Sequence, residues 1–161
     1  MMADRRSLDR PRGEGLGRFF ARAGYDVYLL DPRGHGGSGP EASRSVNWRY
    51  DDIVQRDLPA AIHAAKARHP EQPLVLLGHS LCGHGGAASL GLDQRLPVDA
   101  LVMLAANVWL PRLEPSRAHW LSKRALLHSW TQITRLRGFF PARALRLGSA
   151  DEARSYVAQF E

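Results

Sequence analysis

The stretch PLVLLGHSLCGHGG, residues 73–86, decides the fold of this chain. Its first part, residues 73–77, is an unbroken apolar run, which is typical of a strand buried on both faces of a parallel sheet. A glycine-rich turn around Ser80 follows, and then small residues that can form a helix packed close to the strand. We therefore expect Ser80 to lie at a sharp strand-to-helix turn, where a substrate can reach its hydroxyl.

A helix that begins directly after Ser80 aims its unbonded N–H groups and its positive dipole end at the place where an oxyanion would form. The turn is tight, so the residues two before and two after the serine must be small, as Gly78 and Cys82 are. The segment GHSLCG, residues 78–83, resembles the nucleophile elbow G-x-S-x-G of the α/β-hydrolase superfamily, with Cys82 where the second glycine is usual.

This resemblance implies a serine hydrolase that acts on a carboxylic ester or a related acyl substrate, a small molecule. Ser80 would be the nucleophile, the backbone N–H of Leu81 would form half of the oxyanion hole, and His79 would shape the wall of the elbow. The family chemistry needs neither a metal nor an organic cofactor, so we expect neither here.

A second motif, DPRGHGGSG at residues 31–39, follows an apolar run at residues 25–30 that reads as a strand. It is similar to the D-x-R-G-x-G-x-S loop that many α/β-hydrolases carry two elements before the elbow. The resemblance implies that Asp31, Arg33 and Gly34 shape the wall beside the site. Two family motifs in the right order, with one helix between them, are more specific than either motif alone.

The same loop contains a literal G-x-G-x-x-G at residues 34–39, so a dinucleotide-binding protein is a rival interpretation. That motif requires a helix that begins inside the glycines and meets the pyrophosphate with its N-terminus. Here Pro40 and a polar loop come next, and the helical pattern begins about eight residues later. The hydrolase interpretation is therefore favoured.

The order of elements predicts an α/β fold, because strands at residues 25–30, 73–77 and 98–104 alternate with helical patterns. With the resemblance, we expect a truncated three-layer parallel-sheet α/β-hydrolase fold. Residues 1–15 would be a loose N-terminal arm and residues 16–106 a partial hydrolase core.

Residues 107–161 have a helical pattern that is either a truncated cap-like region or further core helix, and periodicity does not separate the two. Within this region Gly138 and Pro141 should end one helix whose apolar face carries Leu126, Trp130, Ile133 and Leu136. Residues 149–152, SADE, read as a capping box that begins the next helix.

Two sets of catalytic groups that the family has are not found at the expected positions of this sequence: the acid and the His, and the oxyanion loop with its strand. No strand remains after which a catalytic His could follow, and Asn107 stands at the strand end where some family members place the acid. His84, His119 and His128 fall within helical patterns. The family also has a strand and an oxyanion loop before Leu16, and without that strand the strands at 25–30 and 73–77 must pair directly or leave backbone groups unpaired.

We therefore expect a central fragment of a hydrolase domain, inactive or nearly so, and a non-catalytic remnant or interaction module is the alternative. The composition of the 161 residues, 44% hydrophobic and 24% charged, is that of a globular protein. The net charge of +6 comes from scattered arginines without a nucleic-acid-binding module, so no nucleic-acid partner is expected. With one cysteine, no signal peptide and no apolar run that spans a bilayer, we expect a cytoplasmic protein; its substrate and oligomeric state stay open.

Overall fold

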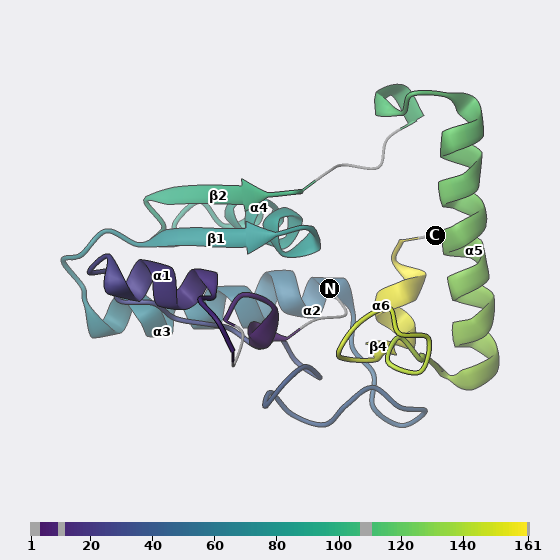
Figure 1. The fold of residues 1–161 in the computed structure, drawn as a ribbon, viewed down its shortest axis with the longest axis horizontal. Coiled ribbons are helices and arrows are strands. Elements are labelled where there is room, and N and C mark those ends of the chain that lie inside the picture. The colour runs from purple at the N-terminus through teal and green to yellow at the C-terminus, as the bar shows by residue number, and fades with distance from the viewer. Residues whose placement is uncertain (1–3, 10–11, 107–110, 161) are drawn as a thin grey trace.

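The structure is a computed structural model that describes residues 4–9, 12–106 and 111–160. Figure 1 shows β1 (Val75–His79) and β2 (Ala100–Leu104) with α1 (Leu16–Arg22), α3 (Leu58–Arg68) and α4 (Leu81–Leu92) at one end of the molecule. Strand β4 (Glu152–Ala153) lies with α5 (Arg117–Arg137) and α6 (Arg154–Ala158) at the other end. The elements, in chain order, are η1 (Arg5–Ser7), α1 (Leu16–Arg22), α2 (Tyr50–Asp52), the π-helical η2 (Ile53–Asp57), α3 (Leu58–Arg68), β1 (Val75–His79), α4 (Leu81–Leu92), β2 (Ala100–Leu104), η3 (Pro111–Leu113), α5 (Arg117–Arg137), β3 (Phe139–Phe140), β4 (Glu152–Ala153) and α6 (Arg154–Ala158).

The predicted strands on either side of α4 are confirmed, and they pair with each other. β1 and β2 are parallel, with a register that runs from Val75 opposite Ala100 to His79 opposite Leu104. β3 and β4 form a separate antiparallel pair of two residues each. The described residues thus form a mixed α/β structure with a small parallel sheet.

The predicted strand at residues 25–30 is wrong, because these residues form no strand in the structure. The strand that β1 pairs with is β2, and the apolar side chains of residues 25–30 are largely exposed, with Tyr25 at 64%. Strand structure needs a hydrogen-bonded partner as well as suitable side chains. Residues 25–30 have the side chains but do not pair with β1.

Helix α4 packs against both strands through its glycines. A Cβ atom on Gly78, in β1, would lie 2.6 Å from the backbone of Gly83 in α4. A Cβ on Gly86 would lie 3.0 Å from side-chain atoms of Leu76 and Leu101, one from each strand. The contact between helix and sheet is therefore close because these positions lack side chains.

The helical pattern expected about eight residues after the glycine loop is confirmed as a continuous run through α2, η2 and α3. The buried hydroxyl of Ser89 in α4 donates a hydrogen bond of 2.6 Å to the carbonyl of Val54 in η2. This bond fixes the helical run against α4. No helix among the described residues has the length and apolar character needed to cross a membrane.

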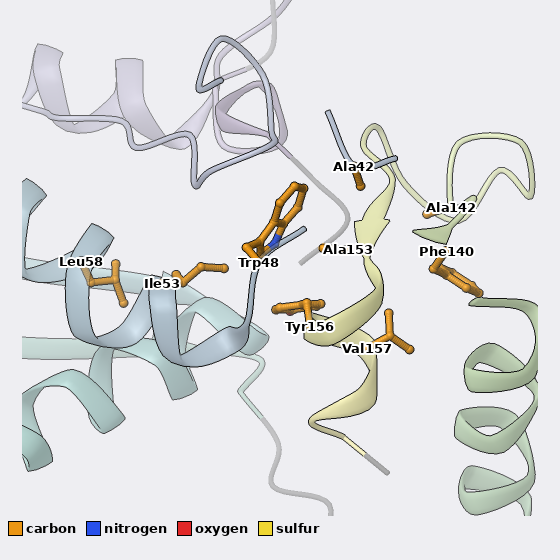
Figure 2. Packing of buried hydrophobic residues seen from close by; sticks show 9 residues of the cluster. All are labelled: Ala42, Trp48, Ile53, Leu58, Phe140, Ala142, Ala153, Tyr156 and Val157. Atoms are coloured by element: carbon orange, nitrogen blue, oxygen red, sulfur yellow. The ribbon is translucent and has the colours of Figure 1, made fainter. Parts of the chain in front are cut away.

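One apolar cluster joins the two ends of the molecule, as Figure 2 shows. Trp48 and Ile53 face Tyr156 of α6 across the cluster, and Phe140 packs near the end of α5. Residues on both sides of the predicted boundary at residue 106 therefore share one cluster. Its buried members are Ala42, Trp48, Ile53, Leu58, Phe140, Ala142, Ala153, Tyr156 and Val157.

Helix α5 ends as predicted, with Gly138 in the left-handed conformation at φ 86°. Its expected apolar face is only partly buried, because Trp130 and Ile133 pack on the cluster whereas Leu136 is 82% exposed. The predicted capping box at residues 149–152 is wrong. Ser149 accepts a hydrogen bond from the Asp4 N–H, and Glu152 lies in β4 rather than in the first turn of α6.

Glu152 instead forms a buried pair with His35, and the two residues are 0% and 1% exposed. The His35 Nε2 lies 3.2 Å from the Glu152 Oε1, and its Nδ1 lies 2.9 Å from the Arg33 carbonyl oxygen. Both neighbours of the ring are acceptors, so the imidazolium, which donates from both nitrogens, fits best. Burial lowers the pKa of His35, but the hydrogen bond and charge of Glu152 outweigh burial, and the net pKa is raised.

The close contact between α4 and β1 predicts opposite effects for two glycine substitutions. Gly78→Ala should lower the free energy of unfolding by about 1–3 kcal/mol, because its Cβ meets the Gly83 backbone. Gly91→Ala, in helix α4 and with no atom within 4 Å of the added Cβ, should raise the free energy of unfolding by about 0.5–1 kcal/mol. Urea unfolding of both variants measures the difference, and equal effects would contradict the packing described.

The buried pair predicts a pH-dependent stability. Because the pKa of His35 is raised above its ordinary value of 6.5 in the folded chain, its contribution is full below about pH 6.5 and is lost as the pH rises through the raised pKa. Glu152→Gln allows a neutral His35 and should remove this dependence, at a cost of about 1–3 kcal/mol at mildly acidic pH. Urea unfolding across the neutral range measures both effects.

The matched control is Glu41→Gln, which removes a carboxylate from the exposed ion pair with Arg143. An exposed pair contributes at most about 1 kcal/mol, so this variant should keep the wild-type pH dependence. A Glu152→Gln chain that still loses stability with rising pH to the wild-type extent would show that the pair is not the titrating unit.

Candidate active site

Ser80 lies between β1 and α4, where the chain turns from strand to helix within one residue. Its backbone is at φ 53° and ψ −126°, a strained region for a residue with a side chain. Its N–H donates to the Leu104 carbonyl at 2.8 Å, and its carbonyl accepts from the Gly83 N–H at 3.0 Å. Ser80 is thus held between the end of β2 and the first turn of α4, and it is exposed.

The sequence analysis expected small residues two before and two after Ser80, but the structure requires them two before and three after it. The close contact falls on Gly78 and Gly83, whereas Cys82 lies half-buried beside it. A side chain of moderate size therefore fits at position 82 without separating helix from strand. Burial raises the pKa of the Cys82 thiol, so the thiolate that would make it a nucleophile is disfavoured.

Leu81 is the first residue of α4, and His79 is the exposed last residue of β1. The N–H groups at the start of an α-helix have no partner within the helix, and those of α4 follow Ser80 directly. A negative charge that develops next to the serine would lie near these donors. The roles assigned to Leu81 and His79 stay predictions.

No His or carboxylate forms a hydrogen bond with the Ser80 hydroxyl among the described residues. The His35 ring is fully buried with both nitrogens engaged, so it does not serve as a base for an exposed serine. His84 lies in α4, and His119 and His128 lie on α5. Two further His–carboxylate pairs, His69–Asp26 at 3.3 Å and His119–Glu114 at 3.4 Å, do not involve Ser80 either. Asn107 lies outside the described residues.

The loop at residues 31–39 is filled by contacts within the chain. Asp31 accepts hydrogen bonds from the backbone N–H and the guanidinium of Arg5 and from the Gly37 N–H. Burial raises the pKa of Asp31, but the backbone N–H groups of Arg5 and Gly37, with the Arg5 charge, bring it below its usual value. Arg33 binds both carboxylate oxygens of Asp57, at 2.7 and 2.6 Å. These contacts hold the loop against residues 4–9 and the start of α3.

The glycines of this loop are needed for its own packing. A Cβ on Gly34 would lie 2.0 Å from the Trp48 ring, and one on Gly36 would lie 2.2 Å from the Asp31 carboxylate. Both glycines also have positive φ, 75° and 54°. The next helix begins only at Tyr50. The loop therefore lacks the open glycine cradle at a helix start that a dinucleotide pyrophosphate needs.

The described residues contain no group of three or more His, Cys, Asp or Glu side chains that could hold a metal ion. Two cavities lie beside α5 and α6, and Ser80 lines neither of them. The buried pair of His35 and Glu152 was missed by the sequence analysis, which assigned Glu152 to a capping box. The two residues are 117 positions apart, and no local pattern signals such a pair.

Comparison with known proteins finds two curated relatives. Over 73 residues the chain is 37% identical to "Lipase lipl-1" of Caenorhabditis elegans, which covers 42% of this chain and 18% of the relative. Over 88 residues it is 33% identical to "Monoacylglycerol lipase" of Mycolicibacterium smegmatis, which covers 55% of this chain and 29% of the relative. The chain thus matches less than a third of the length of each relative. No solved structure matches it significantly.

A family model covers far more of the chain than either relative. It is described as "Serine aminopeptidase, S33", and it matches residues 12–154, which include the loop motif at residues 31–39 and the elbow. This match and the two lipase relatives agree with the resemblance drawn from the motifs. The chain therefore belongs to the S33 serine aminopeptidase family of α/β-hydrolases.

Proposed function

We propose that this chain carries the nucleophile of a serine hydrolase that acts on carboxylic esters or related small acyl substrates. The observation that supports this most is the strained backbone of Ser80, at φ 53°, in an exposed turn directly before α4. Strained non-glycine residues persist only where surrounding contacts hold them, and they cluster at active sites. The positive end of α4 lies beside this turn.

In the proposed reaction the Ser80 Oγ attacks the acyl carbon while a base accepts the hydroxyl proton. The carbonyl oxygen becomes an oxyanion near the Leu81 N–H, and the leaving group departs with a proton to give an acyl-serine. Water then cleaves the acyl-serine and releases a carboxylic acid. In this reaction β1 and α4 supply the nucleophile and one oxyanion donor, whereas the base and the second donor come from other segments.

The comparisons support cleavage of an acyl bond, but they differ on whether this bond is an ester or an amide. The relatives are named as lipases, which supports an ester, and the family description names an aminopeptidase, which cleaves an amide. Both reactions pass through attack of a serine on an acyl carbon. We propose an ester because the two named relatives agree on it, and the cytoplasmic location expected from the sequence stays a prediction.

The architecture of the whole hydrolase is also part of the proposal. A parallel sheet is normally covered on both faces, yet Val75 in β1 is 52% exposed. Residues 25–30, which have the side chains of a strand, do not pair with β1. This supports a larger three-layer sheet in the complete enzyme, with residues 107–161 as a cap-like region. Little activity in this chain by itself is also part of the proposal, since no described His or carboxylate forms a hydrogen bond with the Ser80 hydroxyl.

A fluorophosphonate that forms a covalent bond with activated serines tests the proposal. We expect slow labelling of the folded chain at Ser80 in preference to its other serines, located by peptide mass spectrometry. Added imidazole should raise the rate several-fold, below the roughly 10²–10⁴-fold that a positioned base contributes. Ser80→Ala should abolish the imidazole-dependent labelling.

Ser129→Ala is the matched control, because Ser129 is an exposed serine within a regular helix, with its hydroxyl bonded to the Ala125 carbonyl at 2.8 Å. This variant should label at the wild-type rate, and unfolding in urea should remove the preference for Ser80. If Ser80 in the folded chain reacts no faster than Ser129, the chain is a non-catalytic remnant or interaction module instead.

A further inference from the structure

Two adjoining cavities between α5 and α6 are not explained by the proposed hydrolysis. The first has a volume of about 370 Å³ and lies where the loop before α2 meets the end of α5 and the start of α6. Three of its lining residues are arginines, and none of the described lining residues is acidic. It is lined by Arg44, Asn47, Arg135, Leu136, Gly138 and Arg154.

The second cavity, of about 390 Å³, is lined by Thr131, Thr134, Arg135, Arg154, Val157 and Ala158. Arg135 and Arg154 line both cavities, so the two are neighbours. The hydroxyls of Thr131 and Thr134 already donate to carbonyls of their own helix, at 3.1 and 2.6 Å. Apart from the shared arginines, this cavity therefore offers a ligand mainly apolar contact.

Two of the arginines that line the first cavity, Arg44 and Arg154, have no carboxylate partner among the described residues. Arg33 and Arg143, by contrast, are each held by carboxylates. Arg44 donates through Nε to the Arg137 carbonyl at 3.2 Å, which leaves its terminal nitrogens as donors. The guanidinium groups of Arg44 and Arg154 both line this cavity, so an anion bound between them would be attracted by both charges.

Neutralisation of a helix end explains only part of this cluster. Basic residues in the last turn of α5, Arg135 among them, oppose the negative end of the helix dipole. Arg44 and Arg154 come from other segments of the chain. The Arg44 side chain is also positioned by Gly138, because a Cβ on that glycine would lie 2.7 Å from the Arg44 Cγ.

We propose that these cavities form one binding site for an organic oxyanion that carries an aliphatic chain. The carboxylate lies between Arg44 and Arg154, where guanidinium groups can bind it with paired hydrogen bonds. The aliphatic chain lies in the second cavity against Thr131, Val157 and Ala158. Cavities of roughly 300–1,000 Å³ suit small organic ligands. The site does not include Ser80, so it does not depend on the proposed hydrolysis.

Isothermal titration calorimetry of the full chain with octanoate tests this site. We expect saturable binding that weakens as NaCl is added, since the contact is charged and partly exposed. Acetate, which keeps the carboxylate but lacks the chain, should bind at least about tenfold more weakly, because even two buried methylenes contribute about that factor. Octyltrimethylammonium, with the opposite charge, should not bind.

Variants separate the two halves of the site. Arg154→Gln and Arg44→Gln should each weaken octanoate binding by about tenfold or more, because each removes charge-assisted hydrogen bonds to the carboxylate. Arg124→Gln removes an equal charge from exposed α5 surface that lines neither cavity and should change little. Ala158→Leu, which fills the apolar cavity, should weaken octanoate but not acetate.

Thermal melting of each variant checks that it is folded. No saturable octanoate binding by the folded wild-type chain would overturn the proposal. So would equal losses from Arg124→Gln and Arg154→Gln, or equal binding of octanoate and octyltrimethylammonium, because either result would mean that the arginine cavity does not select the ligand.

Discussion

The contact between the backbones of Gly78 and Gly83 is the constraint on which the elbow depends. A Cβ at Gly78 would lie 2.6 Å from that backbone, so α4 lies closer to β1 than side chains normally allow. The chain must then turn from strand to helix at Ser80 alone, which requires the positive φ of 53°. Strain of this kind costs about 1–3 kcal/mol, and the packing of α4 on both strands offsets it. The exposure of Ser80 follows from this packing rather than from the serine itself.

A second set of contacts holds the loop at residues 31–39, and it involves the whole length of the chain. Trp48 packs on Gly34, Asp31 binds residues near the N-terminus, and His35 pairs with Glu152 in β4. The loop is therefore a junction between segments that are far apart in the sequence. These contacts occupy the loop's glycines, which explains why they do not form a nucleotide cradle; the role of the loop beside the active site stays a prediction.

The sequence predicted those elements whose structure depends on neighbouring residues, and it failed where the structure depends on residues far away in the chain. β1, β2, α4 and the end of α5 follow from apolar runs and from Gly138, so their existence was predicted to within a few residues. Residues 25–30 have equally good strand side chains, yet they form no strand, because strand formation depends on a partner. The capping box at residues 149–152 failed because Glu152 is buried against His35, and that long-range pair outweighs capping of the five-residue α6.

The difference between local and long-range causes also applies to Ser80, the proposed nucleophile, and to the groups that would activate it. The Ser80 turn is built from β1, α4 and β2, which lie within residues 75–104, and the apolar run followed by a glycine-rich turn in that stretch was enough to predict it. A base and its orienting carboxylate must come from segments that fold next to the turn from elsewhere, and no glycine or apolar spacing near Ser80 specifies them. The geometry that exposes the serine is therefore encoded locally, whereas its reactivity depends on tertiary contacts. In the proposed hydrolase, residues 75–104 therefore hold Ser80 in its strained, exposed turn, and the groups that activate its hydroxyl must come from other segments.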